Sequence, residues 1–115
     1  MAIELLKTLD IIEAMENFIA RKRPPEDIRD QLDLSYKIEG QSVIVFEIRP
    51  YWENKEEKIE PKIAKATFVK AKDHWKIFWQ RSDLKWHSYK PRPTVKSLND
   101  FVNTIEEDKY HCFWG

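Results

Sequence analysis

The sequence predicts an α+β protein in which a four-stranded antiparallel sheet, built from two hairpins, carries an N-terminal and a C-terminal helix on one face. Three observations support this prediction: a helical hydrophobic period at the start of the chain, a period of two through its middle, and a second helical period near its end. A chain of 115 residues has room for one hydrophobic core, so we expect residues 1–115 to form a single domain.

The N-terminal helix is predicted by apolar residues at spacings of three and four: Leu5, Leu9, Ile12, Met15 and Ile19. Pro24 and Pro25 prevent the helix from continuing. The basic triplet Arg21-Lys22-Arg23 suits the negative end of the helix dipole, and the alternative interpretation is a binding patch.

Two strands of a first hairpin follow. Apolar and polar residues alternate from Leu32 to Ile38, which is typical of a strand with one solvated face. Residues 39–42 include Gly40 and form the turn, and the β-rich run 43–49 returns as the second strand until Pro50 ends it. The charged stretch 53–58 has no periodicity and is expected to be a solvated loop.

A second hairpin is predicted from residues 63–71 and 74–81, with a two-residue turn that places Phe68 opposite Ile77. One face then collects Ala64, Ala66, Phe68, Trp75, Ile77 and Trp79, and the other collects Lys65, Thr67, Val69, Lys76, Phe78 and Gln80. The first set is the expected core, since small alanines leave room for the indoles. A slip of one residue would exchange the faces, so which face is buried stays open.

The C-terminal third is predicted to contain one irregular segment and one helix. Residues 82–93 hold two prolines and are expected to form a short edge strand around Trp86. The last helix should begin near Ser97, three residues before Asp100, and bury Leu98, Phe101, Val102 and Ile105. We expect the aromatic tail, residues 109–115, to pack back on the domain.

Composition excludes several classes of protein. Cys112 is the only cysteine, so the chain is not a disulfide scaffold, and two glycines cannot supply a glycine-rich phosphate loop. The N-terminus lacks the pattern of a signal peptide, and the longest apolar run, Val43–Phe46, is too short to span a membrane. We therefore expect a cytoplasmic protein that does not enter a membrane.

Charge is distributed unevenly along a chain whose formal net charge is zero. Residues 61–96 carry 10 basic and 2 acidic side chains, between two acidic ends. This pattern predicts either a surface for an anionic partner or charges that pair within the fold.

The densest group of unusual side chains lies between Trp75 and Tyr89. Tryptophan with arginine and lysine can stack on bases while neutralising phosphates, although Trp75 and Trp79 also fit a core and Arg81 with Asp83 also fits an ion pair. With the corner formed by Arg49 and Trp52, the candidate binding residues are Arg49, Trp52, Lys65, Lys76, Phe78, Arg81, Asp83, Lys85, Trp86, His87 and Tyr89.

Catalytic and metal sites are less well supported by the sequence. His87 has the chemistry of a general base that Asp83 could orient, but no nucleophile stands in a known motif, so we assign no catalytic residue. The candidate metal ligands, His74, His87, His111 and Cys112, lack the spacing that metal sites use. We expect no metal and no cofactor.

Several spaced motifs resemble one family over nearly the whole chain. They are Arg49-Pro50-Tyr51-Trp52, Ala64-Lys65-Ala66-Thr67-Phe68, Trp75-Lys76-Ile77-Phe78-Trp79, the run from Arg81 to Tyr89, and Phe113-Trp114-Gly115. With these motifs the chain resembles the domain of unknown function 3024 family. The resemblance implies a bacterial single-domain protein and supplies no activity, cofactor or catalytic residue.

Three functional hypotheses follow from the sequence. The first is a non-enzymatic binding module for an anionic partner, either nucleic acid or an acidic protein surface. The second is a small enzyme or ligand-binding protein with a pocket around His87 and Asp83. The third is a structural or assembly protein that dimerises through an edge strand or the aromatic tail, and the oligomeric state stays open.

Overall fold

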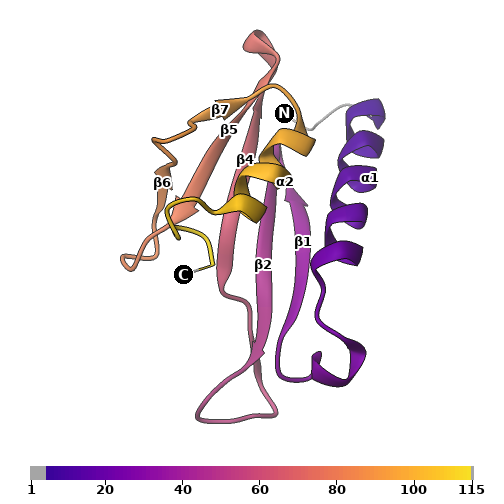
Figure 1. The fold of residues 1–115 in the computed structure, drawn as a ribbon, viewed down its shortest axis with the longest axis vertical. Helices are drawn as coiled ribbons and strands as arrows, with labels where there is room; N and C mark the ends of the chain where they lie inside the picture. The colour runs from indigo at the N-terminus through magenta and orange to yellow at the C-terminus, as the bar shows by residue number, and fades with distance from the viewer. Residues whose placement is uncertain (1–4, 115) are drawn as a thin grey trace.

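The computed structural model describes residues 5–114 and has the predicted α+β architecture (Figure 1). The helical elements are α1 (Leu5–Lys22), η1 (Glu26–Ile28), η2 (Lys70–Lys72) and α2 (Leu98–Glu107). The strands are β1 (Asp33–Glu39), β2 (Ser42–Pro50), β3 (Lys58–Ile59), β4 (Lys62–Val69), β5 (His74–Gln80), β6 (Trp86–Ser88) and β7 (Thr94–Val95).

The sheet is antiparallel and larger than the four strands predicted from the sequence. Its main order is β1-β2-β4-β5-β6, with β3 paired to β2 and β7 paired to β5. Strand β6 is the edge strand expected around Trp86. The other additions, β3 and β7, have two residues each, so they contain too few positions to show an alternating pattern.

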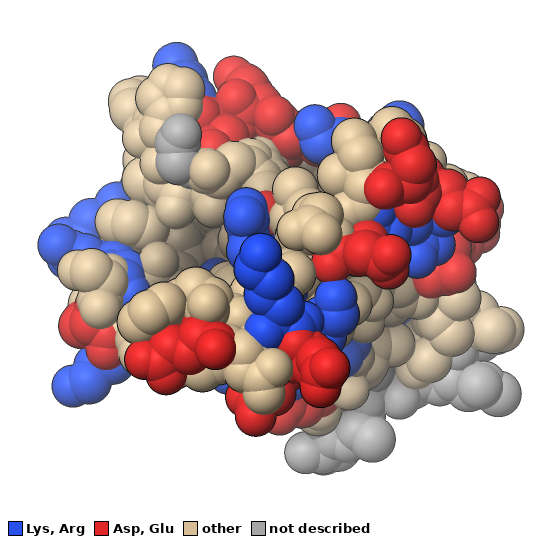
Figure 2. All heavy atoms as spheres, turned by 90° about the horizontal axis from the view of Figure 1, so that it is seen from below, with Lys and Arg blue, Asp and Glu red and all other residues tan. Residues whose placement is uncertain are grey.

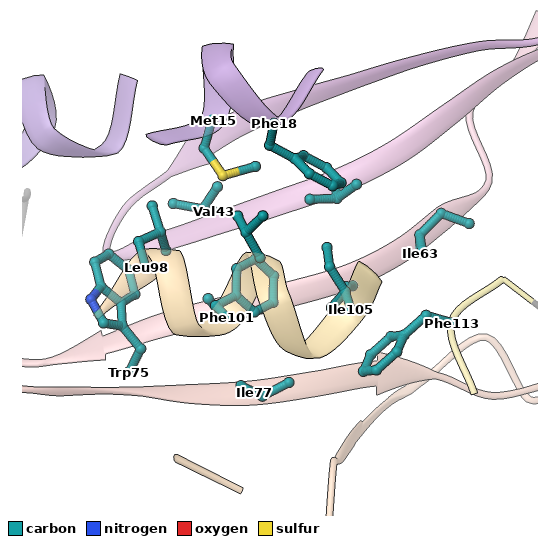
Figure 3. Close-up of a cluster of buried hydrophobic side chains, with 14 of the residues drawn as sticks. Met15, Phe18, Val43, Ile63, Trp75, Ile77, Leu98, Phe101, Ile105 and Phe113 are labelled. Carbon is teal, nitrogen blue, oxygen red and sulfur yellow. The ribbon is translucent and has the colours of Figure 1, made fainter. Parts of the chain in front are cut away.

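Both helices contribute to one core on a single face of the sheet (Figure 3). Helix α1 buries Ile11, Met15 and Phe18 there, and α2 buries Leu98, Phe101, Val102 and Ile105. The sheet supplies alternate residues of its central strands: Val43, Val45, Ala64, Ala66, Trp75 and Ile77. Because these positions share one face, the prediction that both helices pack on the same side is confirmed.

The buried stripe of α1 differs from the predicted one. Leu9 and Ile12 were expected in the core but are 55% and 40% exposed, whereas Ile11 and Phe18 are buried. The side chain of Leu5 lies outside the described part of the structure. Apolar residues occupy more than one stripe of this helix, and contact with both the sheet and α2 selects the stripe that is buried.

The second hairpin has the predicted faces but a different register. Phe68 lies opposite Trp75, and Ala66 lies opposite Ile77. The turn is longer than two residues, because the 3₁₀ turn η2 and the left-handed Asp73 (φ 47°) connect the strands. The register therefore moves by two positions, and a slip of two leaves every side chain on its predicted face.

The C-terminal region follows the prediction closely. Ser97 caps α2, and its hydroxyl oxygen accepts a hydrogen bond from the Asp100 N–H at 3.1 Å. The tail folds back, as expected: Phe113 is buried, and the Trp114 indole N–H donates to the Ile105 carbonyl at 2.7 Å. Gly115 lies outside the described residues. Within residues 5–114, neither helix is both long and apolar enough to cross a membrane.

Candidate functional site

One face of the sheet carries the helices, and the opposite face presents aromatic rings and lysines. We define the open face by side chains that point away from the helices: Lys37, Ile44, Phe46, Lys62, Lys65, Lys76, Phe78 and Trp86. The register aligns Lys37, Ile44, Lys65 and Phe78 in a row across β1, β2, β4 and β5. Such a row runs perpendicular to the strands, so it forms a continuous track across the sheet.

Lys65 lies at the centre of the open face, between two aromatic rings. Its ammonium nitrogen is 4.9 Å from the ring centroid of Phe78 and 4.9 Å from that of Trp86. Both distances are within the range of a cation–π interaction. The half-buried position lowers the pKa of the Lys65 ammonium, because burial disfavours its charged form.

Lysine side chains also shield the apolar residues of β2 on this face. Ile44 and Phe46 are 5% and 7% exposed, although they point away from the helices. The Lys37 ammonium lies 5.8 Å from the centroid of Phe46, and Lys65 is the cross-strand neighbour of Ile44. Long lysine stems thus cover apolar surface while their charged ends stay near solvent.

The β5–β6 turn, at one end of the open face, is closed by Asp83. Its carboxylate accepts hydrogen bonds from the Lys85 backbone N–H and from His87 Nε2, both at 2.9 Å. These bonds hold the pKa of the Asp83 carboxyl below its usual range, the Lys85 N–H having the larger effect. The Arg81 guanidinium carbon, at the start of this turn, lies 5.5 Å from the ring centroid of Trp79 in β5.

The contact between Asp83 and His87 meets one requirement of the enzyme hypothesis, a hydrogen bond that orients the imidazole. However, the Asp83 side chain is 47% exposed, and its bond to the Lys85 N–H is typical of an Asx turn. The contact between Asp83 and His87 is therefore explained by its structural role, which is to fix the turn that precedes Trp86. Within residues 5–114, no three His, Cys, Asp or Glu side chains are grouped in a way that could hold a metal ion.

The structure separates the candidate residues that the sequence placed on one surface. Trp52 is 78% exposed in the loop after β2, and Arg49 pairs with Glu47 at 3.0 Å near that loop. This loop forms the lower end of the molecule, whereas the β5–β6 turn lies at its left side (Figure 1). Arg49 and Trp52 therefore do not extend the open face.

Tyr89 requires a correction, because its side chain is in the core. It is 3% exposed, and its ring centroid lies 4.8 Å from that of Phe113. The Tyr89 backbone N–H donates to the Ile77 carbonyl at 2.9 Å, which holds the residue against β5. Lys65, Lys76, Phe78 and Trp86 remain together on the open face, with Arg81, Asp83, Lys85 and His87 on or beside the adjoining turn.

Several open-face residues were missed by the sequence analysis. Phe46 and Lys37 could have been found from the alternation of β1 and β2, once those strands were placed beside β4. Lys62 gave no such signal, because the β2–β4 register shifts between Val45 and Phe46 and only then brings Lys62 opposite Phe46.

Charges elsewhere on the molecule pair with one another. Arg23 forms a two-pronged contact with Asp33 at 2.7 and 2.8 Å, and Arg21 pairs with Glu106. The hydrogen bonds from Arg23 lower the pKa of the Asp33 carboxyl. Viewed from its lower end, the molecule shows basic side chains in the centre with acidic ones around them (Figure 2). These pairs lie outside residues 61–96, whose lysines Lys62, Lys65 and Lys76 are on the open face, and the anionic partner expected from the charge pattern stays a prediction.

The fold and this surface define a class of protein: an α+β protein with a single sheet, helices on one face and an aromatic and lysine surface on the other. The chain matches the family described as "Domain of unknown function (DUF3024)" over residues 4–115, and it belongs to that family. Comparisons with curated proteins and with solved structures gave no match.

Proposed function

We propose that this protein is a non-enzymatic binding module whose open face holds single-stranded nucleic acid. The observation that carries the proposal is the position of Lys65, whose ammonium lies 4.9 Å from the rings of both Phe78 and Trp86 on the face without helices. Aromatic rings stack on bases of any sequence, and an adjacent ammonium neutralises a phosphate. The site therefore combines the two interactions that single strands require.

The remaining lysines of the open face extend this site. Lys62 and Lys76 are exposed, and Lys37 lies over Phe46 on the neighbouring strands. The track contains Lys37 and Lys65, and Lys62 and Lys76 lie in neighbouring rows of the same face. Four lysines on one face suit a backbone with one negative charge per nucleotide. Because the protein as a whole has no net charge, we expect affinity to come from this face and to fall as salt rises.

The aromatic rings favour nucleic acid over an acidic protein surface as the partner. Carboxylates would engage the lysines alone, and they would gain nothing from Phe78 and Trp86. A nucleotide interacts with both the aromatic rings and the lysines, since its base stacks on Trp86 while its phosphate reaches Lys65. The cytoplasmic location expected from the sequence would give the protein access to RNA.

The test is fluorescence anisotropy with labelled 12-nucleotide RNA and DNA of random sequence, at about 50 and 200 mM salt. We expect binding at the lower salt that weakens several-fold at the higher, as phosphate contacts require. Trp86→Ala should weaken binding about tenfold, the effect of one lost stacking contact. A labelled polyglutamate peptide should bind much more weakly than the RNA.

Tyr110→Ala is the matched control. Like Trp86, Tyr110 has a lysine over its ring, Lys109 at 5.8 Å, but Tyr110 is exposed where Trp86 is half-buried, and it follows α2, the helix on the opposite side of the sheet. Its loss should leave RNA affinity unchanged. The proposal is wrong if nothing binds at low salt, if both variants lose affinity equally, or if polyglutamate binds as well as RNA does. Urea unfolding of each variant shows whether a loss of affinity reflects a loss of fold.

A further inference from the structure

A hollow in the open face contains one carboxylate among its lysines. It extends between the β1–β2 turn and Trp86, and its lining residues are Glu39, Gly40, Ser42, Ile44, Lys62, Lys65 and Trp86. Trp86 supplies an aromatic wall, Ile44 an apolar floor, and two lysines supply positive charge. Neutralisation of phosphates explains the lysines of this hollow but not the presence of Glu39, because a carboxylate repels phosphate.

We propose that Glu39 reads a nucleobase stacked on Trp86, and that the base it selects is guanine. This inference rests on the proposed function, because it assigns a base preference to the same surface. An ionised carboxylate only accepts hydrogen bonds, and it has two oxygens for two donors. Guanine is the base that presents two adjacent N–H donors, at N1 and N2, to such a pair of oxygens.

The other bases fit this hollow less well. Adenine and cytosine each present one amino group, so they satisfy one carboxylate oxygen. Uracil places its single N–H donor between two carbonyl oxygens, which the carboxylate repels. Guanine also carries the acceptors O6 and N7 on its adjoining edge, and Lys62 and Lys65 supply donors in the same hollow.

The position of Glu39 permits this contact. It is the last residue of β1, on the same face of the strand as Lys37, and it lies opposite Ser42 across the turn. Its side chain is 63% exposed, and one of its oxygens is 3.9 Å from the Lys37 ammonium, a long contact that leaves the carboxylate accessible. Glu39 and Lys65 line the same hollow. Burial lowers the pKa of the Lys65 ammonium, and the negative charge of Glu39 offsets part of that effect.

The experiment uses labelled RNA nonamers of uridine that differ only in the central base. For the wild-type protein we expect the guanine nonamer to bind about tenfold more tightly than the all-uridine one, with adenine and cytosine between them. Glu39→Ala should reduce the guanine-to-uridine ratio to about one, by weakening guanine binding and relieving the repulsion of uracil. Glu57→Ala, the same loss of charge in the loop after β2, should leave the ratio unchanged.

The outcomes separate this inference from the proposed function. If all nonamers bind equally and still depend on Trp86, the base preference is wrong while the nucleic-acid site stands. A guanine preference that survives Glu39→Ala also overturns the role of Glu39. If no nonamer binds, the proposed function fails, and the inference fails with it.

Discussion

Asp108 holds Trp114 in place through its side chain: Oδ2 accepts a hydrogen bond from the Trp114 backbone N–H at 2.9 Å. The other oxygen, Oδ1, accepts from the Phe113 N–H at 3.1 Å. Asp108 is 7% exposed and adopts a left-handed conformation, with φ at 41°, directly after α2. One buried carboxylate thus fixes the reversal that returns the aromatic tail to the core.

Replacing Asp108 should destabilise the protein. We expect Asp108→Ala to lower the free energy of unfolding by about 2–4 kcal/mol, because the buried Phe113 N–H and the half-buried Trp114 N–H lose a charged acceptor. Asp108→Asn should cost less, since asparagine keeps one acceptor oxygen and tolerates the left-handed conformation. Urea unfolding monitored by tryptophan fluorescence measures both changes.

Asp73→Ala is the control for backbone strain. Asp73 is also left-handed, with φ at 47°, but it lies in the β4–β5 turn far from the tail. Alanine in that conformation costs about 1 kcal/mol at either position. Equal losses for the two alanine variants would contradict a role for the Asp108 carboxylate in holding the tail.

Tyr89 should behave as a core residue and not as a binding residue. Truncation by Tyr89→Ala removes a ring that packs on Phe113, and should cost about 3–5 kcal/mol of folding free energy. Tyr89→Phe keeps the ring and should leave RNA affinity at the wild-type level. A clear loss of RNA affinity in a folded Tyr89→Phe variant would return Tyr89 to the binding site.

Lys65 should be needed for binding and dispensable for folding. We expect Lys65→Met to bind RNA several-fold more weakly, because methionine keeps the stem and removes the charge. At pH 7 its resistance to urea should equal or exceed that of the wild type, since burial disfavours the ammonium in the folded state. A large loss of stability would mean that the contacts with Phe78 and Trp86 outweigh the effect of burial.

The stability difference between wild type and Lys65→Met should depend on pH. The pKa of Lys65 is lower in the folded protein than its ordinary value of 10.5, so the folded state releases the proton first. At a pH below the pKa of Lys65 in the folded protein, Lys65 is charged in both the folded and the unfolded state, and its burial destabilises the wild type in full. As pH rises from that pKa through 10.5, Lys65 becomes neutral and the destabilisation disappears. The difference in unfolding free energy between Lys65→Met and the wild type should therefore be smaller at pH 10 than at pH 7 when it is measured by urea unfolding.

How much of the fold the sequence predicts depends on the length of each pattern. Strands β4 and β5 alternate over eight and seven residues, so their faces were predicted correctly. Their register was wrong, because nothing in the letters of Lys70–Lys72 distinguishes a 3₁₀ turn from strand residues. In α1 the apolar period allowed more than one stripe, and packing against both α2 and the sheet decides that Ile11 is buried and Ile12 is not.

The open face was predictable only where its residues lie on long alternating strands. Alternation within β4 and β5 placed Lys65, Lys76 and Phe78 together. The contact of Trp86 with Lys65 depends on how β6 pairs with β5, and three residues after a turn do not specify that pairing. Glu39 was assigned to a turn, and its place in a hollow beside Trp86 results from long-range packing.

The lysines above the aromatic rings also affect how two copies of the protein meet. A sheet with one uncovered apolar face tends to stack on another such face. Here that approach would bring Lys37, Lys62, Lys65 and Lys76 of each copy against the same lysines of the other. Like charges would have to lose water while facing each other, so we expect the face to resist self-association and to stay available to a partner of opposite charge.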